Sequence, residues 1–243
     1  MKYTKGSEWK LPLKQGRAPI VEPVTELNRI KIKDNGEPLI DALKLLKRSE
    51  IHPERKDYKK KAPYKFHGRE QLVDMLRTAE KALPRKHKFV LWGIYRGMDE
   101  QIKIYKEVYK HFKKKNPHWP ENILRRQTNR FVHPPDIKTP PGHSTGGAVD
   151  LSILGPDGEP LDMTEPYDAK SDERRRVAAT FSPWLAEQAR QNRKILIHAM
   201  NEAGFTNYGG EWWHWSYGDS CWAWRERRKV AIYGPATLPD KKH

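Results

Sequence analysis

Hydrophobic residues recur every three or four positions between residues 69 and 83, and this spacing predicts an amphipathic helix that ends before Pro84. The next apolar stretch, residues 89–95, is short and almost continuous, as buried strands are. Helical spacing returns over residues 99–115 and stops before Pro117. This part of the chain is therefore predicted to fold as helix, strand and helix.

More elements are predicted after a proline-rich stretch, residues 116–142, which shows little periodicity and is expected to be a long loop. Residues 148–153 alternate in polarity and are predicted to be a strand. One helix is predicted to follow Asp172, and another to begin with Ser182 as its N-cap and to end at Gly204. The last predicted strand covers residues 211–216.

Helices that alternate with a few short strands indicate an α+β fold, with a small, mostly antiparallel central sheet flanked by helices. Residues 1–65 are rich in Lys and Pro and weakly periodic, apart from a short strand predicted at residues 30–33. We interpret residues 1–65 as a basic N-terminal extension that wraps the core, and residues 66–243 as the main domain. A length of 243 residues fits this single-domain organisation.

Charge says less about function than its size suggests. Lys and Arg number 47 against 31 Asp and Glu, which gives a formal net charge of +16. Such a surplus is compatible with nucleic acid, an anionic membrane surface or an anionic cell-wall polymer as partner. The basic residues form only short runs and no nucleic-acid motif is visible, so neither nucleic acid nor a membrane is expected to be the partner.

Cysteine content and hydropathy restrict the remaining classes. Cys221 is the only cysteine, which excludes an intrachain disulfide framework and any cysteine-cluster metal site. The first residues lack a signal-peptide pattern, and no apolar run approaches the ~18 residues of a spanning helix. A cytoplasmic location is therefore expected.

Two short segments carry the candidate chemistry. His143 and Asp150 are seven positions apart around a glycine-rich stretch, and Glu211 and His214 are three apart much later in the chain. Two imidazoles and a carboxylate suit a catalytic zinc ion, because three protein ligands leave one position for water. Each residue also fits a structural role by itself, His214 as a hydrogen-bonded histidine in a tryptophan-rich segment.

A fourth residue, Glu211, could act as the general base beside such a metal. Residues three apart in a strand point to opposite faces, so Glu211 is expected to precede the strand proper or to lie at a bulge. The preceding Gly209 and Gly210 make this easy.

The patterns His143-x-x-Gly-x-Ala-x-Asp150 and Glu211-Trp-Trp-His214 together resemble the zinc D-alanyl-D-alanine dipeptidases, which are related to D,D-carboxypeptidases and hedgehog-like zinc folds. The resemblance runs from about residue 72 to residue 235. It implies that Zn²⁺ is bound by His143, Asp150 and His214, and that Glu211 serves as general base and acid. It also implies that Arg96, after the apolar strand, stabilises the oxyanion of the tetrahedral intermediate.

Two further positions concern the substrate. The resemblance implies that Asp168 meets the free amine of a dipeptide. Pro141 occupies a position where the family often has serine, which bears on substrate preference rather than on zinc binding.

The function expected from this sequence is zinc-dependent hydrolysis of D-alanyl-D-alanine or a similar dipeptide. One alternative is a D,D-carboxypeptidase or L-alanyl-D-glutamate endopeptidase acting on peptidoglycan, which would need a more open groove. Another is a non-catalytic module that binds cell wall or another polyanion, although such a module has no need of Glu211. The expected partner is a small dipeptide or a peptidoglycan-derived peptide.

Overall fold

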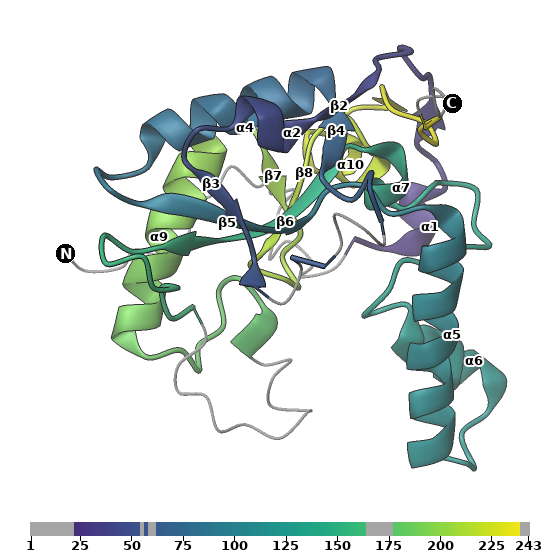
Figure 1. Cartoon of the computed structure of the whole chain (residues 1–243). Helices are drawn as coiled ribbons and strands as arrows, with labels where there is room; N and C mark the ends of the chain where they lie inside the picture. The colour runs from purple at the N-terminus through teal and green to yellow at the C-terminus, as the bar shows by residue number, and fades with distance from the viewer. Residues whose placement is uncertain (1–21, 54–55, 58–61, 164–176, 239–243) are drawn as a thin grey trace.

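A five-stranded sheet forms the centre of the computed structural model, which describes residues 22–53, 56–57, 62–163 and 177–238 (Figure 1). The strand order is β3 (Ser49–Ile51), β5 (Lys88–Gly93), β6 (Ala148–Leu154), β8 (His214–Ser216) and β7 (Thr206–Asn207). Only β3 and β5 run parallel, and the other neighbouring pairs are antiparallel. The predicted α+β class and the mostly antiparallel sheet are confirmed.

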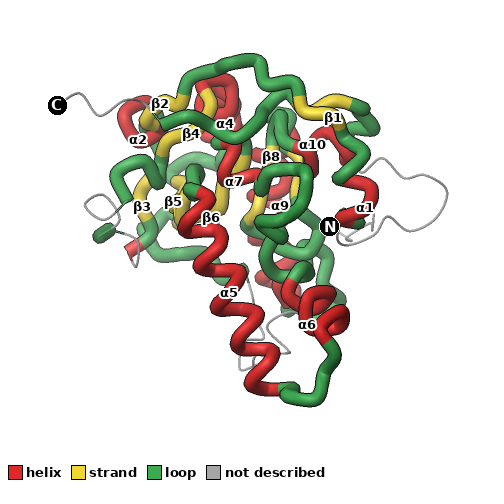
Figure 2. The backbone as a smooth tube through the Cα atoms, turned by 90° about the vertical axis from the view of Figure 1, so that its right-hand side faces the viewer, coloured by secondary structure: helices red, strands yellow, loops and turns green. Residues whose placement is uncertain are grey.

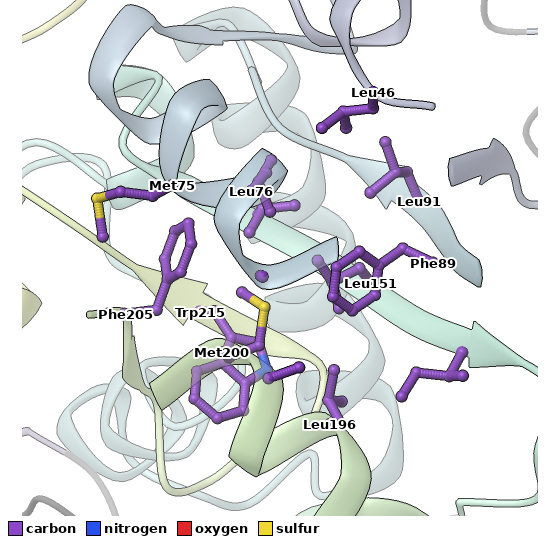
Figure 3. Close-up of a cluster of buried hydrophobic side chains, with 14 of the residues drawn as sticks. Leu46, Met75, Leu76, Phe89, Leu91, Leu151, Leu196, Met200, Phe205 and Trp215 are labelled. Atoms are coloured by element: carbon purple, nitrogen blue, oxygen red, sulfur yellow. The ribbon is translucent and has the colours of Figure 1, made fainter. Parts of the chain in front are cut away.

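One face of this sheet is covered by α4 (Glu70–Ala82) and α9 (Glu187–Glu202), which also contact each other. The apolar stripe predicted for residues 69–83 is the part of α4 that is buried here. Figure 3 shows side chains from both helices meeting side chains from β5, β6 and β8 in one cluster. Burying a side chain such as Leu76 or Leu196 stabilises the fold by roughly 1.5–3 kcal/mol.

Strand β6 separates this core from the candidate site. Val149, Leu151 and Ile153 belong to the hydrophobic cluster under α4 and α9. Because successive side chains in a strand point to opposite faces, Asp150 is directed to the other face of the sheet. The alternation predicted for residues 148–153 therefore places a carboxylate opposite the core.

Residues 22–53 add four small elements before β3: α1 (Val24–Leu27), β1 (Lys31–Ile32), β2 (Leu39–Asp41) and α2 (Ala42–Leu45). Strand β1 confirms the strand predicted at residues 30–33, and it pairs in parallel with β9 (Val230–Ala231). Strand β2 pairs antiparallel with β4 (His67–Arg69). Helix α1 contacts α10 (Ser220–Arg225). The interpretation of residues 1–65 as a wrapping extension stays a prediction.

Helices α5 (Met98–Lys115) and α6 (Glu121–Thr128) lie side by side and extend away from the sheet (Figure 2). Helix α5 confirms the helix predicted at residues 99–115. The prediction of a loop throughout residues 116–142 is wrong, because α6 lies within it and α7 (Gly142–Thr145) begins at its end. Pro120 is the N-cap of α6. The side chain of Leu124 is fully buried and anchors this helix to the protein interior.

Two further boundaries differ from the predictions. Helix α9 begins at Glu187 instead of Ser182, because the Ser182 hydroxyl accepts a hydrogen bond from the backbone of Trp184 in a separate turn. The strand predicted over residues 211–216 is β8, which begins at His214 and not at residue 211, and it is not the last strand, because β9 follows it. The helix predicted to follow Asp172 begins outside the described residues. None of the helices in the described ranges combines the length and apolar character that crossing a membrane requires.

Candidate metal centre and active site

The three candidate metal ligands come together on the face of the sheet opposite α4 and α9. His143 lies in α7, Asp150 lies in β6, and His214 begins β8. Asp150 and His214 are directly paired across the two antiparallel strands. One potential ligand atom from each of the three side chains lies within 4.8 Å of the others. The structure therefore assembles the residues whose spacing predicted a metal site.

Asp150 is the centre of this cluster. Its Oδ2 lies 3.2 Å from His143 Nε2, and its Oδ1 lies 2.9 Å from His214 Nδ1. Burial raises the pKa of Asp150, but the charge and hydrogen bonds of His143 and the hydrogen bond of His214 outweigh it, so the pKa lies well below the usual value. The carboxylate is therefore ionised and available as a ligand.

The backbone immediately after β5 orients the ring of His143 as a metal ligand. Its Nδ1 lies 2.7 Å from the carbonyl oxygen of Ile94, which can only accept a hydrogen bond. Nδ1 therefore donates to this carbonyl, and Nε2, on the side of Asp150, is the ring nitrogen that a metal ion would take. Burial lowers the pKa of His143 to about 4, despite the opposing charge of Asp150, which keeps the ring neutral. A carbonyl partner that fixes the tautomer is typical of metal-binding histidines.

His214 directs Nδ1 towards Asp150, whereas His143 directs Nε2. Its Nδ1 faces Asp150, while its Nε2 lies 3.4 Å from the hydroxyl of Ser216. Burial alone would lower the pKa of His214, but the hydrogen bond and charge of Asp150 raise it overall. The two imidazole rings lie at a steep angle with their centres 4.8 Å apart. Two imidazole nitrogens and a carboxylate oxygen that converge in this way fit a Zn²⁺ ion.

The turn before β8 places Glu211 next to the cluster. Glu211 donates its backbone N–H to Tyr208, and its carbonyl accepts the backbone N–H of His214. Glu211 therefore precedes β8. This agrees with the prediction, because Glu211 and His214 would point to opposite faces of the sheet if both lay within the strand. Burial raises the pKa of Glu211 to about 7, and the charge of Asp150 acts in the same direction, against the opposing effects of His214 and Arg96. A carboxylate with such a pKa suits proton transfer near neutral pH.

Arg96 is held on the other side of Asp150. Its Nη1 donates to the side-chain oxygen of Gln101 at 3.2 Å, and its Nη2 lies 3.7 Å from Asp150 Oδ2. Its Nε is buried and has no hydrogen-bond partner within the described part of the chain. Buried donors are normally satisfied, so an orphaned one beside a candidate metal site is suited to an anionic group of a ligand.

Two residues that the sequence did not single out hold this arginine in place. Gln101 is almost fully buried in α5, where its amide nitrogen donates to the carbonyl of His133 and its oxygen faces Arg96. Ser144 donates its hydroxyl to the carbonyl of Arg96 at 2.8 Å. The backbone N–H of Arg96 also donates to the carbonyl of His143. The segment that carries Arg96 is thus fastened to the helix that carries a candidate metal ligand.

A cavity of about 580 Å³ opens over these residues, and its size is within the range usual for small-ligand sites. Its lining includes all five site residues described above: Arg96, His143, Asp150, Glu211 and His214. Trp92, Trp213 and Tyr208 add aromatic walls. Trp92 and Trp213 pack edge to face, and Tyr208 packs in the same way on His214. A small polar ligand could therefore reach the cluster between these aromatic walls.

Comparison with known proteins assigns this site to a family. The model of the M15 peptidases that is described as D-ala-D-ala dipeptidase matches residues 55–230, well over half of the chain. The chain belongs to this dipeptidase family. The resemblance inferred from the sequence is confirmed, and with it the expectation of an enzyme of the metallopeptidase class.

Individual relatives agree with the family. A D-alanyl-D-alanine dipeptidase of Synechocystis sp. is 27% identical over 242 aligned positions, which cover 87% of this chain and 97% of the relative. A D-alanyl-D-alanine dipeptidase of Escherichia coli is 32% identical over 79 residues, or 32% of this chain and 39% of that relative.

Two positions singled out for substrate contact in this dipeptidase-family chain have different outcomes. Asp168 lies outside the described residues, so its contact with a substrate amine stays a prediction. Pro141 is the N-cap of α7 and lines the cavity next to Gly142. A proline offers no side-chain hydroxyl there, but its carbonyl accepts the backbone N–H of Ser144 and so begins the turn that carries His143.

Proposed function

We propose that this protein hydrolyses D-alanyl-D-alanine or a closely similar dipeptide, with a zinc ion held by His143, Asp150 and His214. The observation that carries the proposal is that this cluster shares one cavity with Glu211 and Arg96, in a chain of the dipeptidase family. When bound there, zinc would polarise the peptide carbonyl and lower the pKa of a water molecule.

Glu211 supplies the proton transfers in this proposal. Its carboxylate accepts a proton from the attacking water and delivers it to the nitrogen of the departing D-alanine. Burial in the cavity supports this role, because a carboxylate with a pKa of about 7 can both accept and release a proton near neutral pH. The adjacent His214 fixes the position of Glu211 through the hydrogen bond between their backbones.

Arg96 stabilises the negative charge that develops on the carbonyl oxygen. Its Nη2 lies 3.7 Å from Asp150 Oδ2, Gln101 holds its Nη1, and its buried Nε has no hydrogen-bond partner among the described residues. A donor that is already oriented and desolvated needs little reorganisation when the charge appears. The partly buried position of Arg96 beside Asp150 therefore favours oxyanion stabilisation over a surface ion pair.

Metal analysis together with a turnover assay tests the proposed function. Purified protein is expected to contain about one zinc ion per chain and to release D-alanine from D-alanyl-D-alanine. Removal of the metal by a chelator should abolish turnover and lower the midpoint of thermal unfolding, and added zinc should restore both. Full turnover by metal-free protein would contradict the proposal.

The same assay with longer substrates separates a dipeptidase from the related peptidoglycan enzymes. Tri-D-alanine and a cell-wall peptide ending in D-alanyl-D-alanine are expected to react much more slowly than the dipeptide. Comparable rates on these substrates would favour a D,D-carboxypeptidase or endopeptidase.

Substitution of Ser144 by alanine tests how the backbone of Arg96 is held. The variant loses the hydroxyl that donates to the carbonyl of Arg96, so kcat is expected to fall about threefold to tenfold while KM changes little. Steady-state kinetics on D-alanyl-D-alanine provide the measurement. Ser182→Ala is the matched control, because that hydroxyl accepts a hydrogen bond in a turn before α9. Equal kinetics for both variants would exclude this role of Ser144.

A further inference from the structure

Asn207, in β7, lies next to the turn that carries both Glu211 and His214. The residue is only 4% exposed, and it is not part of the cavity lining. Its side-chain nitrogen donates to the carbonyl of Glu211 at 3.1 Å and to the carbonyl of His214 at 2.9 Å. An amide nitrogen has two hydrogens, so this one group can hold the backbone of the candidate base and of a candidate metal ligand together.

The chemistry of the neighbouring groups fixes the orientation of the Asn207 amide. Carbonyl oxygens can only accept hydrogen bonds, so the nitrogen of the amide, and not its oxygen, must face Glu211 and His214. The amide oxygen, Oδ1, accepts a hydrogen bond from the hydroxyl of the buried Thr180 at 2.5 Å. Three partners therefore hold the amide in one orientation.

Thr180 is itself held by Arg193, a buried residue of α9. Nη1 of Arg193 donates to the carbonyl of Thr180 at 3.1 Å. The backbone N–H of Thr180 donates to the carbonyl of Gly209, at the beginning of the turn. A continuous network of buried hydrogen bonds thus runs from α9 through Thr180 and Asn207 to the turn that carries Glu211.

The sequence of the turn explains why such a network is needed. Gly209 and Gly210 directly precede Glu211, and glycine leaves the backbone free to adopt many conformations. A general base must lie within hydrogen-bond distance of the proton that it takes, and a displacement of about 1 Å can reduce the rate about 10²-fold. The turn by itself therefore does not fix the position of Glu211 closely enough for proton transfer.

We propose that Asn207 is a positioning residue that fixes the general base Glu211 at a constant distance from the metal ligand His214. In this role Asn207 touches neither the substrate nor the metal, and it acts through the two carbonyls that it holds. Thr180 and Arg193 support it from the protein interior. This inference rests on the proposed dipeptidase function, in which Glu211 is the base and His214 a zinc ligand.

The alternative is that Asn207 only stabilises the edge of the sheet, where β7 pairs with β8. Both roles predict a loss of stability when the amide is removed, because buried polar groups lose a hydrogen-bond partner. Asn192 in α9 is the matched control. It is 5% exposed, and its side-chain nitrogen likewise donates to a backbone carbonyl, that of Asp162, at 2.7 Å. Neither Asn192 nor Asp162 belongs to the cavity lining.

The test replaces each asparagine by leucine, which has a similar size but cannot donate a hydrogen bond. Asn207→Leu is expected to weaken zinc binding about tenfold and, with zinc saturating, to lower kcat on D-alanyl-D-alanine by about 10–100-fold, the range for outer partners of metal ligands. KM should change little, because no substrate contact is removed. Asn192→Leu should also lower the midpoint of thermal unfolding but leave zinc affinity and kcat unchanged. Equal zinc affinity and equal kcat in the two variants would overturn the proposal and leave the stabilising role.

If Asn207→Leu does not fold, Thr180→Val provides the test. Valine keeps the branched shape of threonine but lacks the hydroxyl that orients the amide of Asn207, so kcat and zinc affinity should each fall about threefold to tenfold. Values unchanged from those of the unsubstituted enzyme would contradict the proposal. Absence of turnover in the unsubstituted enzyme would refute the proposed function instead, and the zinc affinities of the variants would still decide whether Asn207 positions His214.

Discussion

Replacing Glu211 by glutamine is expected to leave zinc bound and to reduce kcat on D-alanyl-D-alanine by about 10²–10⁴, the usual contribution of a positioned general base or acid. Glutamine preserves the size of the side chain, and the backbone hydrogen bonds of this position to Tyr208 and His214 do not depend on the carboxylate. What the variant lacks is the buried group that can exchange a proton near neutral pH. Zinc content and steady-state kinetics, measured on the same preparation, separate the two effects.

A control for this variant is Glu226→Gln, which removes a carboxylate from the exposed end of α10 and should leave kcat unchanged. Unimpaired turnover by the Glu211 variant would remove this residue from the mechanism. Loss of the metal together with activity would show that Glu211 contributes to metal binding, and the proposed division between three ligands and one base would then be wrong.

Replacement of Asp150 by asparagine is expected to have the larger effect on the site itself. The Asp150 carboxylate lies between His143 and His214, and it also lies beside the guanidinium of Arg96. Substituting even an outer partner of a metal ligand typically weakens metal binding by about 10–100-fold, so loss of a direct ligand should weaken it at least as much. Competition with a chelator measures the affinity, and turnover should fall to background when zinc is limiting.

The metal-free form of this variant gives a second, independent readout. The fold holds the pKa of Asp150 well below its usual value, which means that the charged carboxylate stabilises the folded state. The midpoint of thermal unfolding should therefore drop in metal-free Asp150→Asn. The matched variant Asp157→Asn, in the exposed turn after β6, should keep both its metal and its midpoint. Stoichiometric zinc in the Asp150 variant would contradict its role as a ligand.

The sequence was most informative where chemistry and periodicity coincide. The alternation over residues 148–153 predicted a strand, and in β6 Asp150 lies on the face opposite to Val149 and Leu151. The opposition between residues three apart in a strand predicted that Glu211 either precedes the strand of His214 or lies at a bulge, and the structure has the first arrangement. Local rules of this kind depend only on neighbouring residues, and these two needed no tertiary contact for their interpretation.

Predictions failed or were missing where distant contacts decide the structure. Helix α6 forms in a proline-rich stretch, where it is held by the buried side chain of Leu124. The local sequence pattern did not predict this burial. Gln101 looked like an ordinary polar residue of a helix, but it is buried between Arg96 and the loop at His133. The buried ion pair of Glu22 with Arg225 had no signal at all, because the two residues lie 203 positions apart.

The long separation between Glu22 and Arg225 has a consequence for how the enzyme is made. Strand β1 likewise pairs with β9 near the end of the chain, and Arg69 donates a hydrogen bond to the carbonyl of Gly234, 165 positions further on. Contacts that join such remote positions slow folding, because the entropy of closing a long loop is lost before the contacts can stabilise the chain. A nascent chain that has not yet reached Arg225 can pair β5 with β6, but the buried carboxylate of Glu22 still lacks its partner. Docking of the segment with α1 and β1 on α10 and β9 is therefore expected to be a late step of folding.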